Sequence, residues 1–318
     1  MVRRMFLLTV VLSCAAARAE EAADQIRPLH TLRGHQRWVQ SLAISTDSQW
    51  LVSGGDDQTL RLWNLKTGGK SLTLRRYDGA VTAVAFHPDG KRIAVGTYDG
   101  ELQVCEAASG KLSRTLERQG VAEGKSVDDG GRSIIKKESA DDTLVTWDAR
   151  DGTELLTFQQ GNEYDVTTAA FSPDGKRILT GDGENELKIW DTDNGDEVRT
   201  LRGHSETVTS AAYSPSGKQI VSASWDDTLR LWDADTGDDL KTLRGHTADI
   251  TSVLFTRDGS QIVSCGEDRT LRIWDAGTGK LSRTIPAHPQ AVLCLAVSPD
   301  GRLLVSGSKE EIRVWPLK

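Results

Sequence analysis

The chain has 318 residues, of which 37% are hydrophobic and 27% are charged, and it contains only eight prolines. This composition is that of a folded globular protein and excludes a low-complexity, disordered chain. The formal net charge of −7 at pH 7 argues against nucleic acid as the partner, because contacts to phosphates require a basic surface.

Residues 1–19 have the pattern of a secretory signal peptide. Arg3-Arg4 precede an apolar run over residues 5–17, and the run ends at Ala17-Arg18-Ala19. The run is too short for a membrane anchor, since a spanning helix needs about 20 apolar residues. We expect cleavage after Ala19, an extracytoplasmic (periplasmic or secreted) location and no membrane insertion of the mature protein. A lipid anchor on Cys14 is the alternative.

After a short segment over residues 20–27, residues 28–318 repeat one pattern of four short strands. In the unit 239–275, apolar and β-branched stretches are separated by turn signals such as Gly245-His246 and Arg257-Asp258-Gly259. Such a pattern predicts four strands in one antiparallel sheet. The expected strands of this unit are residues 240–244, 250–255, 261–265 and 270–274.

The repeats have a fixed length. Intervals of 41 to 43 residues separate successive members of the series Trp63, Cys105, Trp147, Trp190, Trp232, Trp274 and Trp315. A fixed period of about 40–45 residues suits a propeller in which each repeat supplies one four-stranded sheet.

The Gly-His start, the Ser-x-x-x-Asp turn and the Trp-Asp end of the repeats resemble WD repeats over residues 28–318. The resemblance implies an all-β, seven-bladed β-propeller of four-stranded antiparallel blades, and a His–Ser/Thr–Asp–Trp network in each blade. With the signal peptide, the chain is similar to a secreted, bacterial-type WD-repeat protein. Carried over residue by residue, the complete networks are His35, Ser53, Asp57 and Trp63 in blade 1; His204, Ser222, Asp226 and Trp232 in blade 5; and His246, Ser264, Asp268 and Trp274 in blade 6.

The other blades depart from this pattern. Blade 7 is expected to use His288, Ser306, Glu310 and Trp315; blade 4 has Asn162, Thr180, Glu184 and Trp190; blade 2 has Tyr77, Val95, Asp99 and Cys105; and blade 3 has Gln119, Lys137, Asp141 and Trp147. The last repeat lacks a fourth strand after Trp315, whereas residues 28–33 align with residues 239–244. We therefore expect the N-terminal segment to supply the outer strand of the last blade and to close the ring.

In related propellers, partners often dock on the face that carries the Gly-His loops and the Ser-x-x-x-Asp turns. This resemblance assigns partner binding to Trp38, Gln40, Asp56, Tyr98, Asp165, Thr207, Trp225, Asp249, Glu267 and Lys309. Aromatic residues are enriched at binding hot spots, although the rings could instead pack over neighbouring blades. Trp50 is expected near the opposite face.

The sequence favours a non-enzymatic scaffold that binds a protein or peptide and is itself monomeric. It carries no catalytic motif, and we expect no catalytic residue, no cofactor and no metal. The stretches 191–196 and 233–238 resemble calcium loops, but their glycine comes one place early, so we interpret them as turns. Cys105, Cys265 and Cys294 have no zinc spacing and are expected to be buried.

Three other interpretations remain open at this point. The protein could be a propeller enzyme, a small-ligand binder that uses the central channel, or a module of a larger envelope assembly.

Overall fold

A computed structural model describes residues 26–69, 71–87, 89–99, 101–116, 126–127, 133–138, 143–148, 154–159 and 166–317. Within these ranges the regular secondary structure is entirely β-strand. The expected signal peptide, and with it Cys14, lies outside the described residues.

In chain order the strands are β1 (His30–Ile44), β2 (Trp50–Gly55), β3 (Thr59–Asn64), β4 (Leu72–Arg76), β5 (Val81–Phe86), β6 (Arg92–Thr97), β7 (Leu102–Glu106), β8 (Leu112–Leu116), β9 (Ser126–Val127), β10 (Ser133–Glu138), β11 (Thr143–Asp148), β12 (Glu154–Gln159), β13 (Val166–Phe171), β14 (Arg177–Asp182), β15 (Glu186–Asp191), β16 (Glu197–Arg202), β17 (Val208–Tyr213), β18 (Gln219–Ser224), β19 (Thr228–Asp233), β20 (Asp239–Arg244), β21 (Ile250–Phe255), β22 (Gln261–Gly266), β23 (Thr270–Asp275), β24 (Leu281–Pro286), β25 (Cys294–Val297), β26 (Leu303–Gly307) and β27 (Lys309–Pro316).

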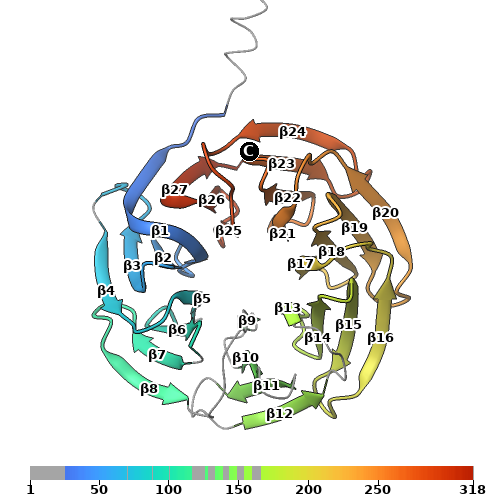
Figure 1. The fold of residues 1–318 in the computed structure, drawn as a ribbon, viewed down its shortest axis with the longest axis horizontal. Coiled ribbons are helices and arrows are strands. Elements are labelled where there is room, and N and C mark those ends of the chain that lie inside the picture. Colours follow the sequence, from blue (N-terminus) through green and yellow to red (C-terminus); the bar gives the residue numbers. More distant parts are fainter. Residues whose placement is uncertain are drawn as a thin grey trace, which may run out of the picture.

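These strands form antiparallel sheets in which neighbours along the chain pair with each other. β5–β8, β9–β12, β13–β16, β17–β20 and β21–β24 each make a four-stranded sheet. Figure 1 shows the sheets arranged around a common centre, with the first strand of each sheet innermost and the fourth at the periphery. We call each four-stranded unit a blade and number it by the repeat that it contains.

The remaining sheet joins the two ends of the described chain, in the order β25-β26-β27-β1-β2-β3-β4. The first part of β1 pairs with β27, as in His30↔Val314, and its later part pairs with β2, as in Leu42↔Ser53. A shift of register between Arg33 and Trp38 separates the two parts. One long strand therefore pairs with β27 in its first part and with β2 in its later part.

The hydrophobic core lies between neighbouring blades. One cluster, for example, combines Leu229 and Leu231 of blade 5 with Ile262 and Trp274 of blade 6. The blades approach closely enough that a Cβ atom on Gly54 would lie 2.3 Å from Val81 Cγ1 of the next blade. Close packing of this kind holds each sheet against its neighbours.

The cysteines belong to this core. Cys105, Cys265 and Cys294 are all buried, as the sequence analysis predicts.

Candidate binding face

In blade 5, four side chains from two strands, a loop and a turn form one hydrogen-bond network. His204 Nδ1 lies 2.8 Å from Asp226 Oδ2, and His204 Nε2 lies 2.7 Å from Ser222 Oγ. Trp232 Nε1 donates to the same hydroxyl at 2.9 Å. Because a carboxylate can only accept, Nδ1 carries the imidazole proton and Nε2 accepts from the serine. We call this network a tetrad.

The same tetrad occurs in blades 1 and 6. In blade 1 the imidazole of His35 lies 2.9 Å from Asp57 and 2.7 Å from Ser53, to which Trp63 donates at 2.8 Å. In blade 6 the corresponding distances are 2.8, 2.7 and 2.9 Å for His246, Ser264, Asp268 and Trp274. All twelve predicted tetrad residues are thus brought together in their three blades.

The tetrad carboxylates are ionised. Burial opposes the charge of Asp57, Asp226 and Asp268, but hydrogen bonds from the histidine and from a threonine two residues later outweigh it. The pKa of each carboxyl consequently lies well below its usual value. Backbone amides that begin the loop after the histidine also donate to each carboxylate. The tetrad therefore fixes the loop after the histidine to the turn that contains the aspartate.

Blade 7 corrects one expectation. Its tetrad contains His288, Ser306 and Trp315, but the acid is Glu311, whose Oε1 lies 3.1 Å from His288 Nδ1. Glu310 is exposed and has a φ of 65°, the left-handed conformation that Asp227 adopts in blade 5. This turn is one residue shorter than in blade 5, so Glu311 takes the role of the aspartate, and its longer side chain reaches the histidine.

In blades 2 and 4, other residues occupy some of the tetrad positions. In blade 2 the hydroxyl of Tyr77 lies 3.5 Å from Cys105 Sγ, and the buried side chain of Val95 stands where other blades have serine. In blade 4, Trp190 donates to Thr180 Oγ1 at 3.0 Å, but Glu184 is exposed and is not the buried acid of a tetrad. Asn162 and most of the blade 3 set lie outside the described residues, and Trp147 is placed only as a backbone position in β11.

Backbone hydrogen bonds join the Gly-His loops to the Ser-x-x-x-Asp turns. The amide nitrogen of Asp56 donates to Trp38 O at 2.9 Å, and that of Trp225 donates to Thr207 O at 3.0 Å. The same bond joins Tyr98 to Ala80 and Glu267 to Asp249. The paired loops and turns of these blades form one surface, which we call the Gly-His face.

The predicted partner-binding residues differ in how far they are exposed on this face. Tyr98 and Trp225 are 61% and 50% exposed, and Glu267 and Lys309 are also exposed. The half-buried members are Trp38, Gln40, Asp56, Thr207 and Asp249. Within blade 1, Gln40 Nε2 donates to Asp56 Oδ1 at 2.9 Å, and Trp38 lies opposite Lys309 in the β1·β27 pairing. Asp165 lies outside the described residues.

The model of the family "WD domain, G-beta repeat" matches residues 26–64, 152–191, 195–233, 237–275 and 279–316, which together are more than half of the chain. The chain belongs to the WD40 repeat family. A second family model, "Anaphase-promoting complex subunit 4 WD40 domain", matches residues 71–123.

Curated relatives of this WD40 chain include the guanine nucleotide-binding protein subunit beta of Arabidopsis thaliana, which is 28% identical over 167 residues, or 49% of this chain and 44% of that protein. The same subunit of Nicotiana plumbaginifolia is 31% identical over 168 residues, with the same two shares. The pre-mRNA-splicing factor cwf17 of Schizosaccharomyces pombe is 25% identical over 189 residues, or 59% and 55%. The matches span about half the length of these relatives. Across the described residues, the structure contains no helix of the length and apolarity needed to cross a membrane.

Some polar side chains beside the Gly-His face of this WD40 fold bind the next blade. The hydroxyls of Thr167, Thr209 and Thr251 donate to the carbonyl oxygens of Val208, Ile250 and Val292, respectively. Each bond joins the innermost strand of one blade to the beginning of the next blade. These hydroxyls therefore join each of the three blades to the one that follows it in the chain.

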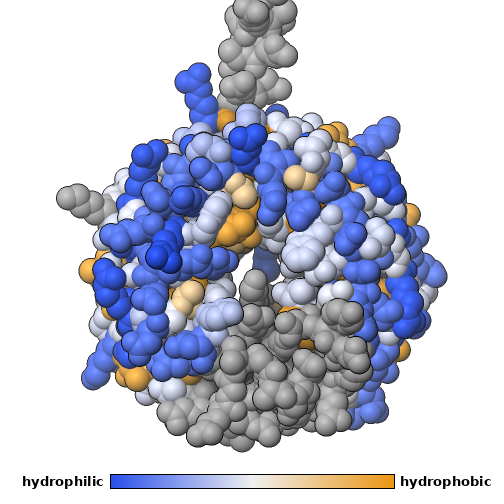
Figure 2. Space-filling view, viewed as in Figure 1, coloured by the Kyte–Doolittle hydropathy of each residue, from blue (hydrophilic) through white to orange (hydrophobic). Residues whose placement is uncertain are grey.

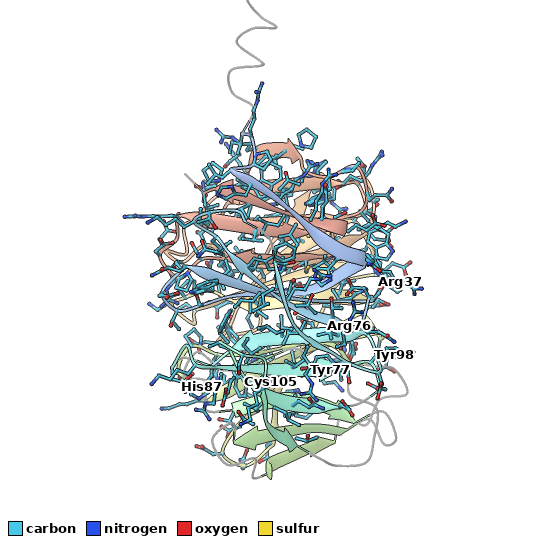
Figure 3. All side chains as sticks on the ribbon, turned by 90° about the vertical axis from the view of Figure 1, so that its left-hand side faces the viewer. Arg37, Arg76, Tyr77, His87, Tyr98 and Cys105 are labelled. Atoms are coloured by element: carbon cyan, nitrogen blue, oxygen red, sulfur yellow. The ribbon has the colours of Figure 1, made fainter. Side chains whose placement is uncertain are left out.

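The sequence interpretation missed two arginines on this WD40 surface. Figure 3 shows Arg37, Arg76 and Tyr98 at one edge of the disc, whereas His87 lies at the other edge. Both arginines are exposed. Arg76 stands directly before Tyr77, where three other repeats carry the glycine of Gly-His. The arginine in place of this glycine is the sequence feature that could have identified Arg76 as a surface residue.

The Gly-His face of the WD40 repeats carries exposed side chains of both charges, including Asp78 and Asp99 in blade 2 and Arg269 in blade 6. Blades 1 and 2 present the two arginines and Tyr98. The loops and turns of blades 5 and 6 present Trp225 among four acids, which we call the acidic sector: Glu206, Asp227, Asp249 and Glu267. In Figure 2 the described surface seen along the ring axis is mainly hydrophilic, with small apolar areas near the centre.

Proposed function

We propose that this WD40 protein is a non-enzymatic scaffold that binds a protein or peptide through its Gly-His face. The observation that carries the proposal is the 50% exposure of the Trp225 side chain on a turn that the blade 5 tetrad holds in place. A large ring that leaves half of its surface in water adds little to folding, but it is the kind of side chain that dominates binding energy at interfaces.

The turn also prepares Trp225 for binding. The next residue, Asp226, is anchored by His204 and Thr228, and the amide of Trp225 is bonded to Thr207. A side chain on a rigid backbone loses little conformational entropy when it is covered by a partner, which increases affinity.

The acidic sector supports a partner with basic character. Four carboxylates lie in the same loops and turns of blades 5 and 6 as Trp225, together with the exposed Arg269, and the whole chain has a net charge of −7. Opposite charge at the rim of an interface increases the rate of association and rejects acidic competitors.

We further infer that the chain forms a closed, seven-bladed and monomeric propeller over residues 28–318. The pairing of β1 with β27 supports closure, because it adds a fourth strand to the sheet β25-β26-β27. Closure would leave only short, protected strand edges and no open edge for a second copy to extend.

We propose an extracytoplasmic location for the mature protein. The pattern of Arg3-Arg4, a short apolar run and Ala17-Arg18-Ala19 supports it, as it supports a secreted, bacterial-type protein. N-terminal sequencing of protein recovered outside the cytoplasm should begin at Glu20, whereas an intact Met1 would contradict the proposal.

Affinity capture from the native extract tests the binding face. Trp225→Ala should weaken retention of the partner by about 2 kcal/mol or more, while its melting temperature stays close to that of the unmodified protein. The matched control is Val198→Ala, which changes a residue that is 43% exposed on β16 of blade 4. Equal retention by the unmodified protein and both variants would show that the partner uses another surface.

A further inference from the structure

An apolar groove lies between blades 1 and 2, away from the Gly-His face. It has a volume of about 770 Å³ and is lined by Ser45, Thr46, Asp47, Trp50, Leu62, Asn64, Leu72, Phe86, Asp89, Gly90, Ala107 and Ala108. Trp50 begins β2, and Gly55 ends it beside Asp56. The groove is therefore at the opposite end of the strands from the predicted partner-binding residues.

The corresponding place between blades 4 and 5 is crossed by polar bridges. Arg177, which occupies the place of Trp50, donates from Nη1 to Ala234 O at 3.2 Å and to Asp235 Oδ1 at 3.3 Å. Arg199, which occupies the place of Leu72, donates from Nη2 to Asp235 O at 3.0 Å. At this junction, two guanidinium groups join one blade to the turn of the next.

Between blades 1 and 2, all three of these polar positions carry apolar residues. Trp50 replaces the first arginine, Leu72 replaces the second, and Ala108 replaces the aspartate. The side chains of Trp50 and Leu72 are 39% and 55% exposed, and the small alanine leaves space between them. Contiguous exposed apolar surface on a soluble protein marks a binding site, and the volume is within the range of ligand pockets, about 300–1,000 Å³.

The charged side chains of the groove indicate what charge its ligand should carry. Asp47 and Asp89 are the ionisable groups among the lining residues. A hydrogen bond from Ser45 lowers the pKa of Asp47. Burial tends to raise the pKa of Asp89, but bonds from the Lys91 amide and Arg92 outweigh it. Arg92 and His87 already pair with Asp89 at 3.0 Å, so Asp47 is the carboxylate that offers charge to a ligand.

We propose that this groove binds an extended peptide segment in which a bulky aliphatic side chain stands next to an arginine. The aliphatic side chain would cover Trp50 and Phe86, and the guanidinium would meet Asp47, much as the guanidinium of Arg177 meets Asp235 within the protein. The proposal is independent of the function proposed for the Gly-His face, because it uses other residues at the opposite end of the strands.

Three synthetic peptides test whether the aliphatic side chain and the guanidinium are both needed. The first is acetyl-Gly-Arg-Leu-Arg-Gly-amide. The two control peptides have serine in place of the leucine, or glutamates in place of both arginines. The readout is the indole N–H resonance of Trp50 in protein labelled with ¹⁵N-tryptophan. The first peptide should shift this signal to saturation with at least about tenfold higher affinity than either control peptide. No saturable shift, or equal affinity for the three peptides, would overturn the proposal.

Variants that recreate the polar bridges provide the second arm. Trp50→Arg combined with Ala108→Asp copies the blade 4–5 junction and should weaken binding of the labelled first peptide at least about tenfold, as measured by fluorescence anisotropy. Leu72→Arg alone changes an exposed position and should also weaken binding, which keeps the test valid if the double variant unfolds. The control Val198→Ala on β16 of blade 4, outside both proposed sites, should bind this peptide with unchanged affinity. Unchanged binding by both groove variants would contradict the proposed site.

Discussion

The tetrad aspartates stabilise the fold and at the same time hold the turns of the Gly-His face. Asp226 accepts hydrogen bonds from His204, Thr228 and the amide of Ser205. Asp226→Ala should therefore lower the free energy of unfolding by about 1–3 kcal/mol, because it leaves these buried donors without an acceptor. Chemical denaturation measures the change. The control Asp193→Ala removes an exposed carboxylate and should stay within about 0.5 kcal/mol; equal midpoints for the two variants would show that the network adds nothing.

His288 gives stability a specific dependence on pH. Burial and the nearby charge of Arg313 lower its pKa from 6.5 to about 4. Between these two values the unfolded histidine binds a proton and the folded one does not, so stability increases with pH in this window. The contribution is complete above pH 6.5 and falls by about 2 kcal/mol as the pH drops from 7 to 5.

The measurement is denaturant unfolding of the unmodified protein and of His288→Gln at both pH values. Between pH 7 and pH 5 the unmodified protein should lose about 2 kcal/mol more of its free energy of unfolding than His288→Gln loses. Parallel changes in both proteins would contradict the assignment.

At the level of elements, the part of β1 that pairs with β27 should stabilise the molecule far more than its length suggests. Leu32 is 2% exposed and packs with Ile312 and Val314 of β27, whereas Leu29 is 53% exposed. Leu32→Ala should cost about 2–5 kcal/mol, and Leu29→Ala should cost no more than about 0.5 kcal/mol. Thermal and denaturant unfolding of the two variants decide this. Similar losses would mean that the first part of β1 does not complete the last blade in solution.

The strands were largely predictable because, in each repeat, a turn follows every strand. In the unit 239–275 the expected strands at residues 240–244, 250–255, 261–265 and 270–274 agree with β20, β21, β22 and β23 to within one residue at each end. The expectation of one sheet was wrong, because β20 pairs with the strands of blade 5 and the other three belong to blade 6. Each aspartate or glycine turn leaves only one register in which apolar residues face the neighbouring blades. The tetrads of blades 1, 5 and 6 were predictable for the same reason, since fixed spacing places their members at fixed points of the sheet.

The acid of blade 7, the groove and the acidic sector could not be predicted from the pattern of the repeat. The acid of the blade 7 tetrad is Glu311 and not Glu310, because in the shortened turn Glu310 takes the exposed left-handed position. The groove between blades 1 and 2 is visible only by comparing junctions, since the bridge from Arg177 to Asp235 joins residues 58 apart in the sequence. The acidic sector likewise combines loops from two repeats.

The described part of the molecule presents two different surfaces at opposite ends of its strands. The Gly-His face carries exposed aromatic rings, two arginines in blades 1 and 2, and an acidic sector in blades 5 and 6. The opposite ends of the strands carry the apolar groove beside Trp50. A scaffold with two such surfaces can hold two chemically different ligands without a conformational change.

Position-specific photocrosslinking tests the central claim most directly. The photo-reactive amino acid p-benzoylphenylalanine is placed at Trp225 in one preparation and at Val198 in another, and both proteins are irradiated in the native extract. The proposed function predicts a crosslinked partner protein at position 225 and a much weaker product, or none, at position 198. Equal crosslinking at the two positions, or none at position 225, would contradict the assignment of the Gly-His face as the binding surface.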